Sequence, residues 1–284
     1  MSRTFCGAAI LRILAAAALA WHPSTRAAEA TVELTVVRAD TLIGLSHRVL
    51  VSPVAWREVA RLNHLPDPDL ILPGQRLRVP VRLLRSEALS ATLISVTGPH
   101  VTVRAGAAAV GTPVVEGDFL QTGPDSSAVL ALPDGSRVQI APSSLAEVAM
   151  SRHYGSRLPA NAAARPTVPA DADAPGAWFA GTLRMLHGSI EVFATKVLRA
   201  KPLEVVTPTA VVGVRGTRYR VSIDGVDDLR THAEVLEGMV RFEPASRADR
   251  RSTTSSDAAD LRSGFGASLS RAGAPDARPP RGSE

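Results

Sequence analysis

The stretch TPTAVVGVRGTRYRV, residues 207–221, places glycines and arginines between valines, which could form a phosphate-binding loop. A Walker loop needs a lysine that reaches the outer phosphates, and a dinucleotide fingerprint needs three glycines that open a helix. GVRGT has neither feature. Tyr219, Val221 and Ile223 then alternate with polar residues, so a strand follows the glycines, and no helix amide groups point at the loop. The pattern therefore predicts strand, turn and strand.

Residue types that support hydrolysis are present but scattered. Six histidines outside the first thirty residues stand singly: His47, His64, His100, His153, His187 and His232. No two of them have metal-ligand spacing. The serines in HGSIE and DGSRV lie in predicted turns without the strand-to-helix elbow that exposes a nucleophile. Asp227 and Asp228 could act as a glycosidase pair, but adjacent carboxylates in a loop are typical of solvated surface. We expect no enzyme, no metal and no cofactor, with a wall-remodelling carboxylate site as the alternative.

The N-terminal segment resembles a secretory signal. Arg3 and Arg12 precede an apolar run at 13–21, and small residues at 24–30 suit a signal peptidase. The run is shorter than the roughly 20 residues that span a bilayer. We expect residues 1–30 to be a signal peptide, the mature protein to be periplasmic and no stable membrane span to remain. An uncleaved anchor is the alternative.

Cysteine content and charge narrow the chemistry further. The only cysteine, Cys6, lies in the predicted signal, so the mature chain would contain no disulfide, thiol nucleophile or thiolate metal site. Without the signal's charges, the formal charge of +5 falls to about +3. This is a weak basis for nucleic-acid binding, and we expect none.

Residues 31–82 predict a small α+β domain in the order strand, helix, helix, strand. Leu34 and Val36 alternate with polar neighbours, as in a strand. Asp40 can cap the first helix, and Ser52 with a following proline can begin the second. RLRVPV then alternates as the second strand.

Three pieces of this segment resemble the lysin motif, LysM: DTL after the first strand, the asparagine that ends the second helix, and PGQRLRVP. That family binds polymers of N-acetylglucosamine, in bacteria usually peptidoglycan. Ala39 replaces the usual glycine before DTL, which would stiffen this loop. The resemblance implies a shallow glycan groove between two loops, formed by Asp40, Thr41, Leu42, Leu70, Ile71 and Leu72. Alternatively, Asp40 is only a helix cap and Leu42 and Ile71 are core residues; both roles can hold together.

Residues 89–244 predict an all-β domain of short stacked strands, which makes the whole fold mainly β with a small α+β domain. LPDGSRVQI, MLHGSIEV and VLEGMVRF each place a polar residue and a glycine between apolar strands, favouring rungs or hairpins. The alanine- and proline-rich segment 155–177 is predicted to be a disordered excursion. Residues 245–284 are predicted to be a low-complexity, disordered tail, in which DLRSGFGASL could add a last strand.

The β region resembles the FecR domain, an all-β periplasmic module. The resemblance lies in VVTPTAVVGVRGTRYRV followed by EVLEGMVRF, and more loosely in GDFLQTGPDSSAVLALPDGSRVQIAPSS. In iron-transport regulators this domain receives a signal from an outer-membrane receptor and passes it to a cytoplasmic sigma factor. Such regulators have a sigma-binding segment and a membrane-spanning helix. We see neither pattern here and do not expect that role.

The two resemblances together imply a non-enzymatic cell-envelope protein. Its LysM domain would bind peptidoglycan, and its FecR-like domain would present a surface for a protein partner in signalling or scaffolding. Arg215, Arg218 and Arg220 are the candidate partner surface if they form one exposed strip, although charged strand residues are often only solvated. A membrane-anchored signalling subunit with an uncleaved signal is the remaining alternative.

Overall fold

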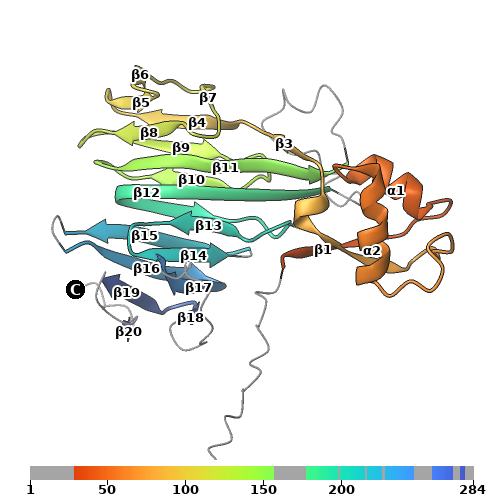
Figure 1. Cartoon of the computed structure of the whole chain (residues 1–284). Coiled ribbons are helices and arrows are strands. Elements are labelled where there is room, and N and C mark those ends of the chain that lie inside the picture. Colours follow the sequence, from red (N-terminus) through yellow and green to blue (C-terminus); the bar gives the residue numbers. More distant parts are fainter. Residues whose placement is uncertain are drawn as a thin grey trace, which may run out of the picture.

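The computed structural model describes residues 29–156, 177–197, 199–214, 216–225, 228–245, 258–270 and 276–278. The predicted signal up to residue 28, residues 157–176 of the alanine- and proline-rich excursion, and Arg215 lie outside the described residues. Figure 1 shows a small domain with two α-helices beside a larger stack of strands. The expected fold, mainly β with a small α+β domain, is confirmed.

The small domain has the predicted strand, helix, helix, strand order. Its elements are β1 (Thr31–Thr35), α1 (Leu42–Val49), the 3-10 turn η1 (Pro53–Ala55), α2 (Trp56–Leu62), β2 (Arg76–Pro80) and the 3-10 turn η2 (Val81–Leu83). The strands β1 and β2 pair antiparallel, with Leu34 opposite Leu77. These two leucines and Leu45 of α1 are almost completely buried, so both helices pack on one face of a two-stranded sheet.

The β domain consists of two facing sheets, here named sheet 1 and sheet 2. Sheet 1 contains β6 (Gly106–Ala107), β5 (Val101–Val103), β8 (Phe119–Thr122), β11 (Leu145–Gly155), β12 (Ala177–Phe193), β13 (Leu203–Val206), β14 (Ala210–Val214), β17 (Met239–Pro244) and β18 (Ala259–Arg262), and β3 (Ser86–Ala88) also pairs with β11. Its pairs are antiparallel except β12 with β13.

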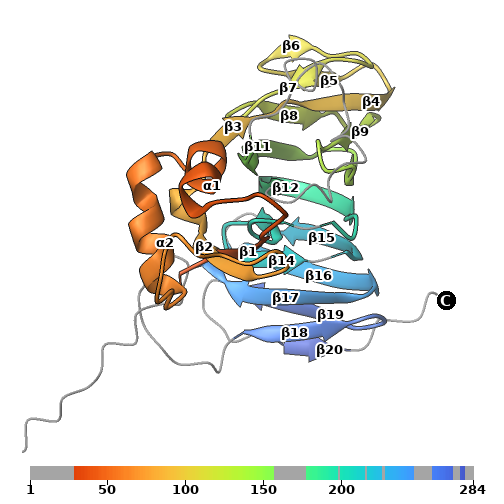
Figure 2. The same ribbon diagram turned by 90° about the vertical axis from the view of Figure 1, so that its right-hand side faces the viewer.

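Sheet 2 runs alongside sheet 1. It contains β7 (Pro113–Val114), β4 (Ala91–Thr97), β9 (Ser127–Ala131), β10 (Arg137–Ile140), the second part of β12, β15 (Arg218–Asp224), β16 (Arg230–Glu237), β19 (Gly266–Ser270) and β20 (Asp276–Arg278). In Figure 2, β14, β17 and β18 lie in one layer, and β15, β16 and β19 in the other. The strands therefore form a sandwich of stacked rungs.

Alternate residues of each strand fill the space between the sheets. On β15, Tyr219, Val221 and Ile223 are buried, as their alternation predicts, and Tyr219 is 0% exposed. One apolar cluster extends from Ala91 in β4 to Leu269 in β19. The sandwich thus has a single continuous core.

The glycines of the loose repeat do not all lie in hairpins. Gly135 turns the β9–β10 hairpin within sheet 2, whereas Gly188 bends β12 from sheet 1 into sheet 2 and Gly238 joins β16 in sheet 2 to β17 in sheet 1. All three have positive φ, between 81° and 90°. Turns and corners both require this conformation, which glycine adopts without a Cβ clash. The local motif therefore does not distinguish them.

Part of the predicted disordered tail is ordered. Residues 258–270 form β18 and β19, joined by a turn at Gly264, and the DLRSGFGASL segment supplies both strands. Leu261, Ala267 and Leu269 are buried in the sandwich core. Burial of these alternate apolar side chains stabilises the strand pairing, and this is the physical reason for the difference.

The two domains are joined by paired backbone. The strand β3 pairs with the end of β11, and the Arg85 amide donates to the Val49 carbonyl oxygen at 2.9 Å. Trp178 and Ala180 of β12 and Ala200 also pack into the core of the small domain. The connection is therefore a structured junction. No helix in the described part of the chain has the length and apolar character needed to cross a membrane.

Candidate binding surfaces

Two loops of the small domain lie side by side. One follows β1 and the other precedes β2. The Val36 amide donates to the Gln75 carbonyl oxygen at 2.9 Å, and the Gly74 amide donates to the Val36 carbonyl oxygen at 2.8 Å. The Gln75 side chain accepts a hydrogen bond from the Leu72 amide at 2.9 Å, which closes the turn before β2. The PGQ motif thus shapes this turn and holds it against the first loop.

Of the six predicted glycan-binding residues, three are exposed, two are buried and Asp40 is intermediate. Leu70 and Leu72 are 66% and 61% exposed, and Thr41 is also exposed. Leu42 and Ile71 are only 4% and 8% exposed and belong to the core of the small domain. Their alternating burial brings Leu70 and Leu72 to the surface and anchors the loop through Ile71. The core alternative therefore describes Leu42 and Ile71.

The helix cap lies one residue later than predicted. Thr41, and not Asp40, is the N-cap of α1: its Oγ1 accepts from the Gly44 amide at 3.0 Å. Asp40 Oδ2 accepts from the Val37 amide at 2.9 Å, and Oδ1 pairs with Arg48 at 3.0 Å. Both residue types can cap, and α1 begins at Leu42, so the threonine is the residue in the capping position. The Asp40 carboxylate instead closes the preceding loop.

Ala39 adopts a backbone conformation that favours glycine. Its φ is 70°, in the left-handed region, where a Cβ costs about 1 kcal/mol. This explains on physical grounds why glycine is usual at this place in the motif. Ala39 keeps the turn but strains it.

Asn63, the asparagine that ends the second helix, connects α2 to β2. Its Nδ2 donates to the carbonyl oxygens of Val59 and Arg78, each at 2.8 Å, and its Oδ1 accepts from the Arg78 amide at 2.7 Å. These bonds tie the last turn of α2 to the backbone of β2. The motif residue is therefore structural.

Two exposed apolar residues were missed in the sequence. Val37, in the loop after β1, is 41% exposed, and Ile43, in the first turn of α1, is 47% exposed. Ile43 lies off the helical face formed by Leu42 and Leu45, and this spacing could have indicated its exposure. Together with Leu70 and Leu72, they give the two loops an apolar surface.

The arginine pair of β15 lies on the outer face of sheet 2. Arg218 Nε donates to Glu191 Oε1 at 2.7 Å, and Arg220 Nη2 donates to Oε2 at 3.0 Å. Both arginine side chains are about half exposed, at 49% and 50%. Burial raises the pKa of Glu191. The hydrogen bonds from both arginines, together with their charges, lower this pKa by more than burial raises it, so the net pKa lies below its ordinary value. One carboxylate therefore offsets part of the predicted positive strip.

The threonine–proline motif before β14 is structural. Thr207 Oγ1 and Thr209 Oγ1 lie 2.6 and 2.5 Å from the buried Thr231 Oγ1 on β16. These hydroxyl contacts connect the two sheets through the sandwich interior. Across the described ranges, no group of three or more His, Cys, Asp or Glu residues is placed to hold a metal ion.

Family comparisons agree with both sequence resemblances. The family model described as "LysM domain" matches residues 34–80, and the one described as "FecR protein" matches residues 118–241. The first match covers the loops described above, and the second runs from the start of β8 into β17. Both are envelope-associated families of binding and signalling domains rather than enzymes.

Comparisons with individual proteins give more distant likenesses. No curated protein matches this sequence. Two crystal structures of a proposed anti-sigma factor from Parabacteroides distasonis match with TM-scores of 0.38, at 15% and 14% identity. Each match covers 57% of this chain and 59% of the other, so the chain spans little more than half the length of those proteins. On the family matches, the chain joins a LysM domain to a FecR-family domain.

Proposed function

We propose that this protein is a non-enzymatic component of the cell envelope that binds peptidoglycan through its LysM domain. Its FecR-like sandwich presents a surface to a protein partner, in envelope signalling or scaffolding. The protein acts in the periplasm after export through its N-terminal signal. One chain would thus carry both a carbohydrate-binding domain and a domain that recognises a protein partner.

The exposed leucines on the loop before β2 carry the glycan-binding proposal. Leu70 and Leu72 have more than 60% of their surface exposed on a loop that is bonded to the loop after β1. N-acetyl methyl groups and sugar ring faces can pack on such apolar side chains. We propose that Leu70, Leu72 and Thr41 contact the glycan, whereas Asp40, Leu42 and Ile71 hold the loops in position.

Sedimentation with purified sacculi tests this role. The mature protein is incubated with sacculi, and the pelleted fraction is measured against sacculus concentration. The double variant Leu70→Ser/Leu72→Ser should bind about tenfold more weakly, because apolar contact area is lost. Val51→Ser/Val54→Ser is the matched control, since these valines of the same domain are 64% and 57% exposed on another segment.

The result separates the alternatives. Equal weakening by the leucine and valine pairs would contradict the assignment of these loops, provided that all variants melt like the wild type. A folded wild-type protein that stays wholly in the supernatant would contradict wall binding itself. Release of soluble muropeptides by the purified protein would contradict the non-enzymatic role.

Crosslinking in intact cells tests the role of the sandwich. The captured partner is identified by mass spectrometry and compared with capture by Arg218→Ser/Arg220→Ser. Because both arginines are half exposed on β15, we expect weaker capture and a cooperatively folded variant. An unfolded double variant would instead show that the Glu191 ion pairs are structural, and unchanged capture would place the partner elsewhere.

A further inference from the structure

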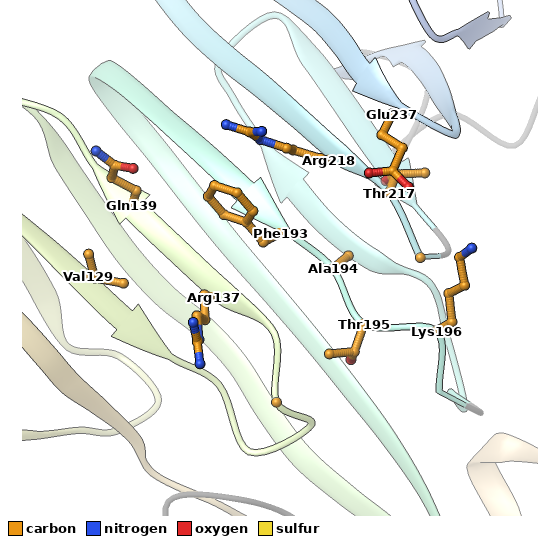
Figure 3. A pocket seen from close by; sticks show the side chains of 12 residues that line it. Val129, Arg137, Gln139, Phe193, Ala194, Thr195, Lys196, Thr217, Arg218 and Glu237 are labelled. Atoms are coloured by element: carbon orange, nitrogen blue, oxygen red, sulfur yellow. The ribbon is translucent and has the colours of Figure 1, made fainter.

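An open pocket of about 540 Å³ lies on the outer face of sheet 2, beside the start of β10, the end of β12 and the start of β15. Figure 3 shows the side chains that line this pocket. They come from β10, from the end of β12 and the segment after it, and from β15. The residues that shape it are Gly135, Arg137, Phe193, Thr195, Lys196 and Gly216. A pocket of this volume can hold a ligand well above the size of a single inorganic anion.

A buried ion pair fixes one wall of this pocket. Arg199 and Asp134 have side chains that are each only 1% exposed, and Arg199 Nε donates to Asp134 Oδ2 at 3.0 Å. Arg199 Nη2 also donates to Ser136 Oγ at 2.9 Å, and Thr195 Oγ1 donates to the Asp134 carbonyl oxygen at 2.9 Å. The β9–β10 turn and the segment after β12 are therefore locked together. Such a wall is formed before any ligand arrives.

Gly216 of the RGT turn positions the lysine. A Cβ at Gly216 would lie 2.3 Å from Lys196 Cγ, and the residue has a φ of +64°. The aliphatic stem of Lys196 thus packs directly on the glycine, while the side chain remains exposed. This contact gives the second glycine of the motif a role other than bending the chain.

Arg137, Lys196 and Arg218 line the pocket together with one carboxylate, Glu237, so positive charge is in excess. Arg218 is paired with Glu191, and its guanidinium lies 4.7 Å from the centroid of the Phe193 ring. Among the described residues, neither Arg137 nor Lys196 forms an ion pair. In Figure 3, Arg137 and Lys196 lie on two sides of Thr195, with Phe193 nearby. A cationic pair beside an aromatic ring suits a carboxylate with an adjoining apolar group.

We propose that this pocket binds an acidic segment of a partner polypeptide, with a side-chain carboxylate between Arg137 and Lys196 and an apolar neighbour on Phe193. The inference rests on the proposed partner-binding role of the sandwich and names the chemistry of that partner. It extends the recognition site from Arg218 and Arg220, which share Glu191, to Arg137 and Lys196, which form no ion pair among the described residues.

Peptide binding to the mature, full-length protein tests the inference. The probe is the capped peptide acetyl-Ala-Glu-Leu-Glu-Ala-amide, followed by amide NMR shifts, with the glutamine counterpart and inorganic phosphate as comparisons. We expect shifts at Gly135, Thr195 and Gly216, and affinity that decreases as NaCl increases. Arg137→Gln and Lys196→Gln should each weaken binding about fivefold or more. Arg262→Gln, an exposed arginine on sheet 1, removes the same charge and should bind like the wild type.

Several outcomes would overturn the inference. These are equal binding of the glutamine peptide, wild-type affinity in Arg137→Gln/Lys196→Gln, equal losses in Arg262→Gln, or phosphate that binds as tightly as the peptide and displaces it. Sacculus sedimentation of the same double variant keeps the tests separate. Loss of peptide binding with normal sedimentation supports the pocket, whereas a wild-type protein that fails to sediment contradicts only glycan binding. If the double variant captured the partner as well as the wild type does, the sandwich would still have a partner, but that partner would not bind at this pocket.

Discussion

In the LysM domain, several separate side-chain hydrogen bonds hold the loops: Asp40 and Gln75 each bond to a backbone amide of their own loop, and Asn63 bonds to the backbone of β2. In the sandwich, the pocket wall is held by Arg199 and Asp134, a charged pair removed from solvent. A buried pair tolerates loss of one member poorly, because the other charge is left without compensation. The pocket wall of the sandwich therefore depends on a network around one buried ion pair, whereas the small domain uses several separate bonds.

Replacement of Arg199 by leucine should give the largest effect. The Asp134 carboxylate would remain buried without its partner, and we expect a loss of about 3–5 kcal/mol in the free energy of unfolding. In the LysM domain, Arg48→Leu breaks the pair with Asp40, whose side chains are 44% and 7% exposed respectively, and should cost about 1 kcal/mol because the Arg48 end of the pair remains solvated. Urea denaturation measures both variants. Equal losses would remove the contrast between the two regions.

The glycine corners should be less tolerant than the LysM turn. A Cβ at Gly188 would lie 2.6 Å from the Cα of Ser144, so Gly188→Ala should cost about 2–4 kcal/mol through overlap and backbone strain. Gly74 also has positive φ, but a Cβ there has no neighbour within 4 Å, so Gly74→Ala should cost about 1–2 kcal/mol. Thermal unfolding of the two variants gives the comparison. A larger loss for Gly74→Ala would contradict it.

Acid should weaken the Glu191 interaction on the sandwich. Its folded pKa lies below the ordinary value, so it adds stability above a pH of about 4.5, and this contribution is lost as pH falls through the folded pKa. Glu191→Gln should lose about 1 kcal/mol at neutral pH and show a flatter pH dependence between about pH 5 and 3. Urea midpoints measured across this range test the difference. Parallel curves for variant and wild type would reject the role of Glu191.

Ala39→Gly should strengthen the LysM domain. Relief of the left-handed strain should stabilise it by up to about 1 kcal/mol, reduced by the greater freedom of glycine in the unfolded chain. The melting temperature and sacculus sedimentation can be measured on the same sample. An unchanged or lower melting temperature would show that the loop bears no net strain at Ala39.

Tyr219→Phe should have the smallest effect, in the core of the sandwich. The Tyr219 hydroxyl is fully buried and has no hydrogen-bond partner among the described residues, and burial raises the pKa of its phenol. Removal of an unsatisfied hydroxyl should leave stability unchanged or raise it by about 0.5 kcal/mol. Calorimetry tests this result. A clear loss would show that a bound water satisfies the hydroxyl.

Local patterns predicted the elements better than the contacts. The alternation at Tyr219, Val221 and Ile223 is a property of neighbouring residues, and it correctly predicted strand β15 and its buried face. Likewise, the order of strands and helices in the small domain follows from spacing within fifty residues. These features need no knowledge of distant segments.

The contacts depend on residues far apart in the chain. Asp134 and Arg199 meet across 65 positions, and Glu191 meets Arg218 across 27. Neither pairing has a local signal. The position of Asp40 was ambiguous for another reason: aspartate and threonine are both good caps, so only the observed start of α1 assigns the role to Thr41.

The paired junction at β3 changes how wall attachment would act on the sandwich. A flexible linker would let the sandwich sample a volume set by linker length, and the local concentration seen by a partner would decrease as that volume grows. Here β3 is hydrogen-bonded to β11, and Trp178 packs into the LysM core. A glycan-bound LysM domain would therefore fix the orientation of the sandwich, and with it the pocket of Arg137 and Lys196, relative to the wall. Partner access would then depend on approach direction as well as distance.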